Sequence, residues 1–365
     1  MKINMNETQT YIFFCLIVLF AFICIWFATI KQKRRKILCL RGKIYIINVS
    51  PQGSLWRILS LAFLASPLVL RNCGTDTSWY FYSYSVNRQI GDEPIFYLLQ
   101  RLLYKVFPDA RIGFGILSVL SLVIVFFAFN ILKDEVDIKY CYLAYFFTQY
   151  FCLYNYMRMM LAVSFLILGY AYILKENKSK ALIVFFIAVG IHFASLAVLV
   201  TYIVVCIFQK NRKLIVLAIL GCTGLFLSNP KMFFSMIKYD RYEQLINSVE
   251  SYTIGLGTFI RVLPIIIIQH CYLKRFKGVI QYNILFISTY LNLAFSFLGY
   301  FSGSASRISN NMMIMHLLFL VPWIIKKIKN KNEKLYLELF YLVYLFGLFF
   351  LSSITWRNIG IVPYR

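Results

Sequence analysis

The stretch ALIVFFIAVGIHFASLAVLVTYIVVCIF, residues 181–208, decides the fold class of this chain. It has twenty-eight residues with no formal charge and a single histidine, His192, near its middle. One upright membrane-spanning helix needs about 20 residues, so the stretch is too long for one crossing and too short for two full ones. We therefore expect a short helical hairpin with half-length or re-entrant arms, whose turn VGIHF holds His192 at a water-accessible membrane surface.

The composition of the whole chain fits this expectation. Hydrophobic residues make up 61% of its 365 residues, and the mean hydropathy is +0.71, which excludes an ordinary soluble domain. The apolar runs are long and uninterrupted, whereas the strands of a membrane barrel would alternate over about 10 residues. We predict an all-α, polytopic integral membrane protein that forms one transmembrane domain, residues 1–365. About twelve crossings, some of them short or re-entrant, are expected near residues 10–30, 55–70, 112–132, 140–156, 159–174, 181–191, 194–208, 214–228, 258–273, 279–298, 311–325 and 335–354.

Basic breaks between the apolar runs predict the orientation. The segments KQKRRKILCLRGK, KENKSK, QKNRK, KRFKG and KKIKNKNEK should all lie in the cytoplasm. Both termini and the turn at His192 then face outward. Two long outer loops follow from the same topology, residues 71–111, with a helix lying on the membrane surface, and residues 229–257.

Arginine and lysine are divided unevenly between the two sides. Of the 38 basic residues, the 24 on predicted cytoplasmic segments are 18 Lys and 6 Arg, whereas the other 14 are 4 Lys and 10 Arg. Topology needs only positive charge, but the planar guanidinium also binds carboxylate and phosphate groups in bidentate fashion. We therefore expect anion binding at the outer face. Any one of these arginines, Arg261 for example, can instead snorkel or pair structurally.

The first outer loop carries a candidate cluster of polar side chains. If a helix begins near Asp76, then Asp76, Tyr80 and Tyr84 share one face and point into one space. The alternative is an N-cap aspartate followed by an interfacial aromatic belt. Further along, PIFYLLQRLLYKVF, residues 94–107, has an apolar stripe opposite polar residues, a pattern typical of a helix at the membrane surface.

Several arginines lie at predicted outer ends of the apolar runs. Arg158 is at the outer end of the tight connection YNYMRMMLAVS, and an arginine at membrane depth normally has a partner or a function. Arg307 lies in YFSGSASRISNN, among small residues that allow close approach of a ligand. Arg88 and Arg241, in the two long outer loops, are weaker candidates. His192 is either a functional imidazole or a residue that merely fixes the hairpin.

The sequence lacks the motifs of several other chemistries. It contains no phosphate-binding loop of the form GxxxxGK[ST] and no dinucleotide-binding GxGxxG, and no spacing of His, Cys and carboxylate residues predicts a metal site. We read His270 and His316 as structural. No cofactor, metal or nucleic-acid partner is expected, and any substrate should arrive through the membrane or from outside.

Four motifs resemble the EpsG-like group of Wzy-type polymerases for bacterial exopolysaccharide, capsule and O-antigen. They are GTDTSWYFYSYS followed by EP, YMRMMLAVSFLILGYAYI, FFIAVGIHFASLAVL and SASRISNNM, in the family's order from about residue 70 to 310. The resemblance implies a GT-C-type membrane glycosyltransferase in the bacterial inner membrane, with its active site facing the periplasm or exterior. Such an enzyme joins undecaprenyl-diphosphate-linked repeat units and works beside membrane lipids, a chain-length regulator and a flippase.

This resemblance gives each candidate residue an expected role. Asp76 and His192 are the candidate catalytic bases. The expected diphosphate and substrate ligands are Arg158, Arg307, Arg88, Tyr80, Tyr84, Glu93 and Arg241. Two other functions stay open: an O-antigen ligase, which differs in its acceptor, and a lipid-linked oligosaccharide flippase, which should carry more charge at the centre of its spans.

Overall fold

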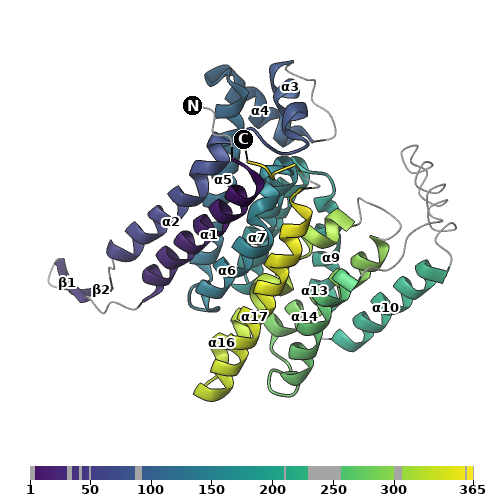
Figure 1. The fold of residues 1–365 in the computed structure, drawn as a ribbon. Helices are drawn as coiled ribbons and strands as arrows, with labels where there is room; N and C mark the ends of the chain where they lie inside the picture. Colours follow the sequence, from purple (N-terminus) through teal and green to yellow (C-terminus); the bar gives the residue numbers. More distant parts are fainter. Residues whose placement is uncertain are drawn as a thin grey trace.

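The computed structural model describes residues 5–30, 35–40, 43–48, 51–86, 93–208, 211–228, 256–299, 306–357 and 360–364. Long apolar helices form most of this part of the chain (Figure 1), and each of the twelve predicted runs falls on a helix. The helices are α1 Glu7–Thr29, α2 Pro51–Leu70, α3 Thr77–Ser85, α4 Pro94–Val106, α5 Ala110–Ile131, α6 Ile138–Thr148, the 3-10 turn η1 Tyr150–Tyr154, α7 Met157–Leu174, α8 Lys178–Ile191, α9 Ser195–Phe208, α10 Arg212–Ser228, α13 Leu256–Cys271, α14 Ile280–Leu298, the π-helix η4 Ile308–Met312, α16 Met315–Lys327 and α17 Lys331–Thr355.

Six of these helical segments are long and apolar enough to cross a membrane. They are Glu7–Thr29, Gly53–Leu70, Ala110–Ile131, Met157–Leu174, Ile308–Lys327 and Lys331–Thr355. Three further apolar helices are shorter, Ser195–Val205, Lys213–Leu225 and Ile260–Cys271. The chain is therefore a multi-pass membrane protein, while the count of about twelve crossings stays a prediction.

One short hairpin interrupts the helical pattern. Strands β1, Arg35–Leu40, and β2, Lys43–Asn48, pair antiparallel in the basic segment between α1 and α2. Their sequences RKILCL and KIYIIN contain isoleucine and tyrosine, which favour strands, and the basic break did not predict this hairpin. The all-α prediction therefore holds for the membrane helices and misses this connection.

The opening stretch breaks at the predicted place. Helix α8 ends at Ile191, His192 follows in an extended conformation, and α9 begins at Ser195. The rings of Phe185 and Tyr202 lie 4.9 Å apart, about equally far from the turn, so the two helices pack against each other as an antiparallel pair. The predicted helical hairpin is confirmed.

The two ends of the bundle differ in the chain segments that meet there. At one end, called here the lysine-rich end, Glu135 in the α5–α6 connection pairs with Lys175 after α7 and with Lys327 of α16. The opposite end, called here the arginine-rich end because Arg158 lies there, contains both chain termini, α3, α4 and the His192 turn (Figure 1). There the N–H of Met5 donates to Tyr364 O. The segments predicted to share one side thus lie at one end, while the membrane side they face stays a prediction.

The central helices carry the candidate arginines. Among the six candidate spans, Met157–Leu174 and Ile308–Lys327 are the most buried, whereas α1, α2 and α17 expose most of their length. Arg158 lies in the first turn of α7, and Arg307 directly precedes Ile308. Both arginines therefore stand at the ends of the two helical segments around which the others pack.

Candidate functional site

Glu93 brings Arg158 and His192 together at the arginine-rich end. Its Oε2 atom lies 2.5 Å from Arg158 Nη1, and its Oε1 atom lies 2.5 Å from His192 Nδ1. The backbone N–H of Phe193 also donates to Oε1, at 3.4 Å. Because Glu93 is only 7% exposed, its carboxylate has little contact with water and depends on these partners.

Three helix ends position this cluster. Glu93 precedes Pro94, which begins α4 and whose fixed φ suits the first helical position. Arg158 lies in the first turn of α7, and His192 is the C-cap residue of α8, with φ of −149°. The side chains thus project from rigid elements, as a precise site requires.

The carboxylate determines which nitrogen of His192 can act as a base. An ionised carboxylate only accepts hydrogen bonds, so Nδ1 carries the proton that it shares with Glu93. In the neutral imidazole, Nε2 is then the acceptor, which is how a carboxylate orients a histidine base in other enzymes. The His192 side chain is 22% exposed, so a substrate can reach it.

Aromatic side chains surround the Arg158 guanidinium. Its Cζ atom lies 5.8 Å from the ring centre of Trp79 and 5.9 Å from that of Phe96, both within cation–π range. Tyr80 of α3 is buried beside them, and burial raises the pKa of its phenol although the charge of Arg158 opposes the shift. Tyr80 is therefore a neutral hydrogen-bonding group at neutral pH.

Asp76 lies at the start of α3, held by the chain segment that leads into α7. Its N–H donates to Asn155 Oδ1 at 2.9 Å, and the Thr75 hydroxyl donates to the same oxygen at 3.1 Å. Asp76 precedes the helix as predicted, yet its side chain makes no capping hydrogen bond. The preceding Gly74 has φ of +107°, and a Cβ there would lie 2.5 Å from Tyr154 O, so only glycine fits this turn.

The predicted face of Asp76, Tyr80 and Tyr84 is only partly correct. The Tyr84 hydroxyl donates to Phe107 O at 2.7 Å, and its ring packs on Phe114 at 5.2 Å. Tyr84 is fully buried and joins α3 to the end of α4, so it lies away from Asp76 in this structure, and its role as a substrate ligand stays a prediction. The helix is short, and its last turn packs against α5 instead of facing the cluster around Glu93.

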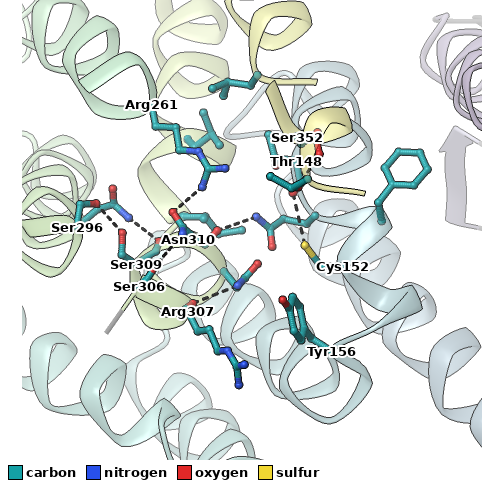
Figure 2. Close-up of a pocket in the computed structure, with 18 of the residues that line it drawn as sticks. Thr148, Cys152, Tyr156, Arg261, Ser296, Ser306, Arg307, Ser309, Asn310 and Ser352 are labelled. Carbon is teal, nitrogen blue, oxygen red and sulfur yellow. Dashed lines mark hydrogen bonds between the residues drawn. The ribbon is translucent and has the colours of Figure 1, made fainter. Parts of the chain in front are cut away.

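A cavity of about 350 Å³ lies among α6, η1, η4, α13, α14, α16 and α17 (Figure 2). Hydroxyl and amide side chains form much of its wall, and Tyr156, two residues before Arg158, also lines it. Among its described lining residues, Arg261 and Arg307 carry formal charge and none is acidic. The cavity is therefore positively charged and polar, although it lies among apolar helices.

Neither cavity arginine has a carboxylate partner among the residues that the structure describes. Arg261 Nη1 donates to Asn310 Oδ1 at 2.5 Å, and Arg307 lies over the Tyr156 ring at 5.5 Å. These neutral partners leave both positive charges uncompensated. The structural ion pair considered for Arg261 is absent from this part of the chain, and Arg261 joins Arg307 at the cavity.

The π-helix η4 builds one wall of the cavity. The N–H of Met313 donates to Ile308 O at 3.0 Å, and Asn292 Nδ2 donates to Ser309 O and Met313 O. This widened turn carries Asn310, whose Nδ2 donates to Ser306 Oγ at 3.1 Å. Such π-turns occur frequently at functional sites, and here both Arg261 and Gln149, the residue after α6, donate hydrogen bonds to Asn310, one to its side chain and one to its backbone carbonyl.

Other candidates lie apart from these two groups. Arg88, Arg241 and most of the second outer loop are outside the described residues. The exposed residues Leu98, Leu102 and Val106 form an apolar stripe on α4, as expected for a helix at the membrane surface. In the described part of the chain, no three His, Cys, Asp or Glu side chains gather as metal ligands.

Sequence reasoning missed several polar residues of the site, among them three amide side chains, and His316, read as structural, also lines the cavity. Asn155 holds the Asp76 turn, Asn310 bonds Arg261, and Gln149 lines the cavity. Gln149 interrupts an apolar run, and a polar residue within such a run is itself a signal of function. Glu93 was expected as a substrate ligand, and the structure shows it as the partner of His192 and Arg158.

The fold and the site define a multi-pass membrane protein with an arginine-lined cavity and a carboxylate–histidine pair at one end. Residues 54–365 match the model of the EpsG family. Because the match covers most of the chain, this protein belongs to the EpsG family, a group of membrane proteins of the polysaccharide-polymerase type. The comparison with curated proteins gives no match, nor does the comparison with solved structures. The family resemblance is confirmed, and the GT-C-type fold stays a prediction.

Proposed function

We propose that this protein joins polyprenyl-diphosphate-linked oligosaccharide repeat units at the outer face of the bacterial inner membrane. The observation that carries the proposal is the pair Arg261 and Arg307, uncompensated by carboxylates of the described cavity wall, at the same end as Glu93 and His192. Such guanidinium groups suit a diphosphate, and the imidazole suits an acceptor hydroxyl. The carrier would be undecaprenyl diphosphate.

The proposed reaction transfers a glycan from one lipid carrier to the next. The acceptor hydroxyl oxygen attacks the anomeric carbon of the donor, and its proton passes to His192 Nε2, with Asp76 as the second candidate base. The bond between that carbon and the carrier diphosphate breaks, and the bonding electrons leave with the diphosphate. Arg261 and Arg307 stabilise the departing charge. We expect metal-independent activity that survives chelators, because these guanidinium groups supply the positive charge.

Arg158 has a different proposed role from Arg307. Its guanidinium already faces the Glu93 carboxylate, so the pair is close to neutral and attracts a diphosphate less than the cavity does. We propose that Arg158 fixes Glu93, which in turn orients His192, and that Tyr80 completes the wall of this cluster. Because the Arg158 side chain is 25% exposed, the acceptor can also contact it.

Deletion of the gene tests the proposed function directly. A polymerase mutant should still attach one repeat unit to the acceptor lipid, visible as a single band on a glycan gel, and the wild-type gene should restore the ladder. Complete loss of the glycan would instead indicate a flippase or a ligase and would refute the proposal.

The membrane side of the site has its own test. In a variant without native cysteines, Thr75→Cys should react with a membrane-impermeant thiol reagent added from outside. Asn211→Cys, between α9 and α10, should react only after the membrane is permeabilised. The reverse pattern would place the site in the cytoplasm and contradict the proposed use of exported lipid-linked substrates.

A further inference from the structure

Gln149 lines the cavity and carries a buried hydrogen-bond acceptor. It follows α6, is 2% exposed, and its Nε2 donates to Asn310 O at 3.2 Å. That carbonyl accepts hydrogen bonds and cannot donate, so the amide nitrogen must face it and Oε1 must point elsewhere. Within the described residues, Oε1 has no hydrogen-bond partner.

A buried acceptor without a partner is rare in folded proteins and requires an explanation. A ligand that supplies an O–H or N–H group is one explanation, and a bound water is the other. The position of Gln149 favours a ligand, because the residue lies in the wall of the cavity that holds both uncompensated arginines.

Asn310 fixes the spacing between the amide and the charge. Its Oδ1 accepts from Arg261 Nη1, while its backbone carbonyl accepts from Gln149 Nε2. The Arg261 guanidinium and the Gln149 amide are thus both hydrogen-bonded to Asn310. If a diphosphate binds to Arg261, the group attached to that diphosphate lies close to Gln149.

We propose that Gln149 recognises a hydrogen-bond donor, a hydroxyl or an amide N–H, on the sugar attached directly to the carrier diphosphate. This inference rests on the proposed function and adds a specificity-determining residue to it. Two different groups then bind the two parts of the donor. Arg261 and Arg307 hold the diphosphate, and Gln149 Oε1 selects the sugar. A site built to hydrogen-bond a polar group rejects ligands that lack it, because the buried acceptor stays unpaired.

The test compares two lipids in the purified, detergent-solubilised protein. One is undecaprenyl diphosphate, and the other is the undecaprenyl-diphosphate-linked repeat unit extracted from the deletion strain. We expect the wild-type protein to bind the sugar-bearing lipid about tenfold more tightly or better. Gln149→Met keeps the length of the side chain. In this variant the affinities for the two lipids should differ by no more than about threefold, while the binding of undecaprenyl diphosphate is not weakened.

Gln269→Met is the matched control. Gln269 is another fully buried glutamine, on the same helix as Arg261 but outside the cavity lining, so its variant should keep the wild-type preference. A wild-type preference in Gln149→Met would overturn the inference, since a water would then explain the unpaired oxygen, and the proposed function would stand. If undecaprenyl diphosphate binding does not depend on Arg261 and Arg307, the proposed function fails and this inference fails with it.

Discussion

Glu93 and Glu135 make the same kind of contact at opposite ends of the molecule. Each carboxylate lies between two basic side chains from other elements, Arg158 and His192 for Glu93, and two lysines for Glu135. The side chain of Glu93 is 9% exposed and its partners lie at 2.5 Å, whereas that of Glu135 is 28% exposed and its lysines lie at 3.3 Å.

The difference lies in how the basic side chains are paired at each end. Compact, strongly hydrated ammonium groups at the lysine-rich end provide positive charge for orientation and weak, solvated ion pairs. At the arginine-rich end, a buried carboxylate fixes an arginine and an imidazole, and two further arginines line a cavity. The lysines at one end are therefore paired with a carboxylate, whereas the two cavity arginines at the other end have no carboxylate partner among the described residues.

The largest expected effect is that of Glu93→Gln. The amide carries no charge and can turn its N–H toward Nδ1, so Arg158 loses its counter-charge and His192 loses its fixed tautomer, and polymer formation should fall about a hundredfold or more. Glycan chain length measures this effect, with membrane abundance determined in parallel. Glu135→Gln, which also removes a carboxylate between two basic partners, is the control and should polymerise normally.

A double variant separates catalysis from stability. Glu93→Gln combined with Arg158→Gln removes both charges, so abundance should recover compared with Glu93→Gln alone while polymerisation stays lost. Recovery of polymerisation in the double variant would reduce Glu93 to a structural partner of Arg158.

Substitution of His192 should have an effect of similar size on the rate. His192→Asn and His192→Gln keep a polar side chain but remove the base, and loss of a general base costs about a hundredfold to ten-thousandfold in rate. The measurement is the rate of chain extension in membranes at matched protein level. Normal extension by either variant would assign His192 to packing of the hairpin, and Asp76→Asn would then test the remaining candidate base.

Arginine-to-lysine changes should have intermediate effects that differ between the two groups. Arg307→Lys and Arg261→Lys keep the charge but lose the bidentate geometry, so polymerisation should fall about tenfold to a hundredfold. Arg158→Lys should lose less, because lysine still neutralises Glu93. Arg357→Lys, in an exposed pair with Glu7 at the same end, is the control. A larger loss in Arg158→Lys than in Arg307→Lys would place the diphosphate at the Glu93 cluster.

The smallest effect concerns stability at the lysine-rich end. Partial burial disfavours the charged form of Glu135, but hydrogen bonds from Lys175 and Lys327 outweigh it and lower its pKa. A lowered pKa contributes stability that is present above the unfolded value of about 4.3 and is lost as the pH falls below it. Glu135→Gln should therefore destabilise the protein by at most about 1 kcal/mol at pH 7. Thermal unfolding in detergent from pH 4 to 7 should show this difference shrinking toward pH 4, and a constant difference would exclude the ion pairs as its source.

The helices, the hairpin break and the grouping of chain segments at two ends were predictable from the sequence. Long apolar runs must form helices in a membrane, because an unpaired backbone group is costly there. The break at His192 follows from the length of residues 181–208, and the two ends follow from the basic segments. These features depend on composition over a window of about twenty residues, which the sequence displays directly.

The pairing of side chains was decided by the tertiary structure. Glu93 and His192 are 99 residues apart in the chain, and nothing local indicates that α4 would bring a carboxylate to the end of α8. Tyr84 shares a helical face with Asp76 in the sequence, yet packing against Phe114 directs it elsewhere. Arg261 has no local signal that separates a cavity residue from a structural one. Helix periodicity fixes which residues share a face, but the packing of neighbouring helices determines what each face meets, and the chemistry of the site arises from those contacts.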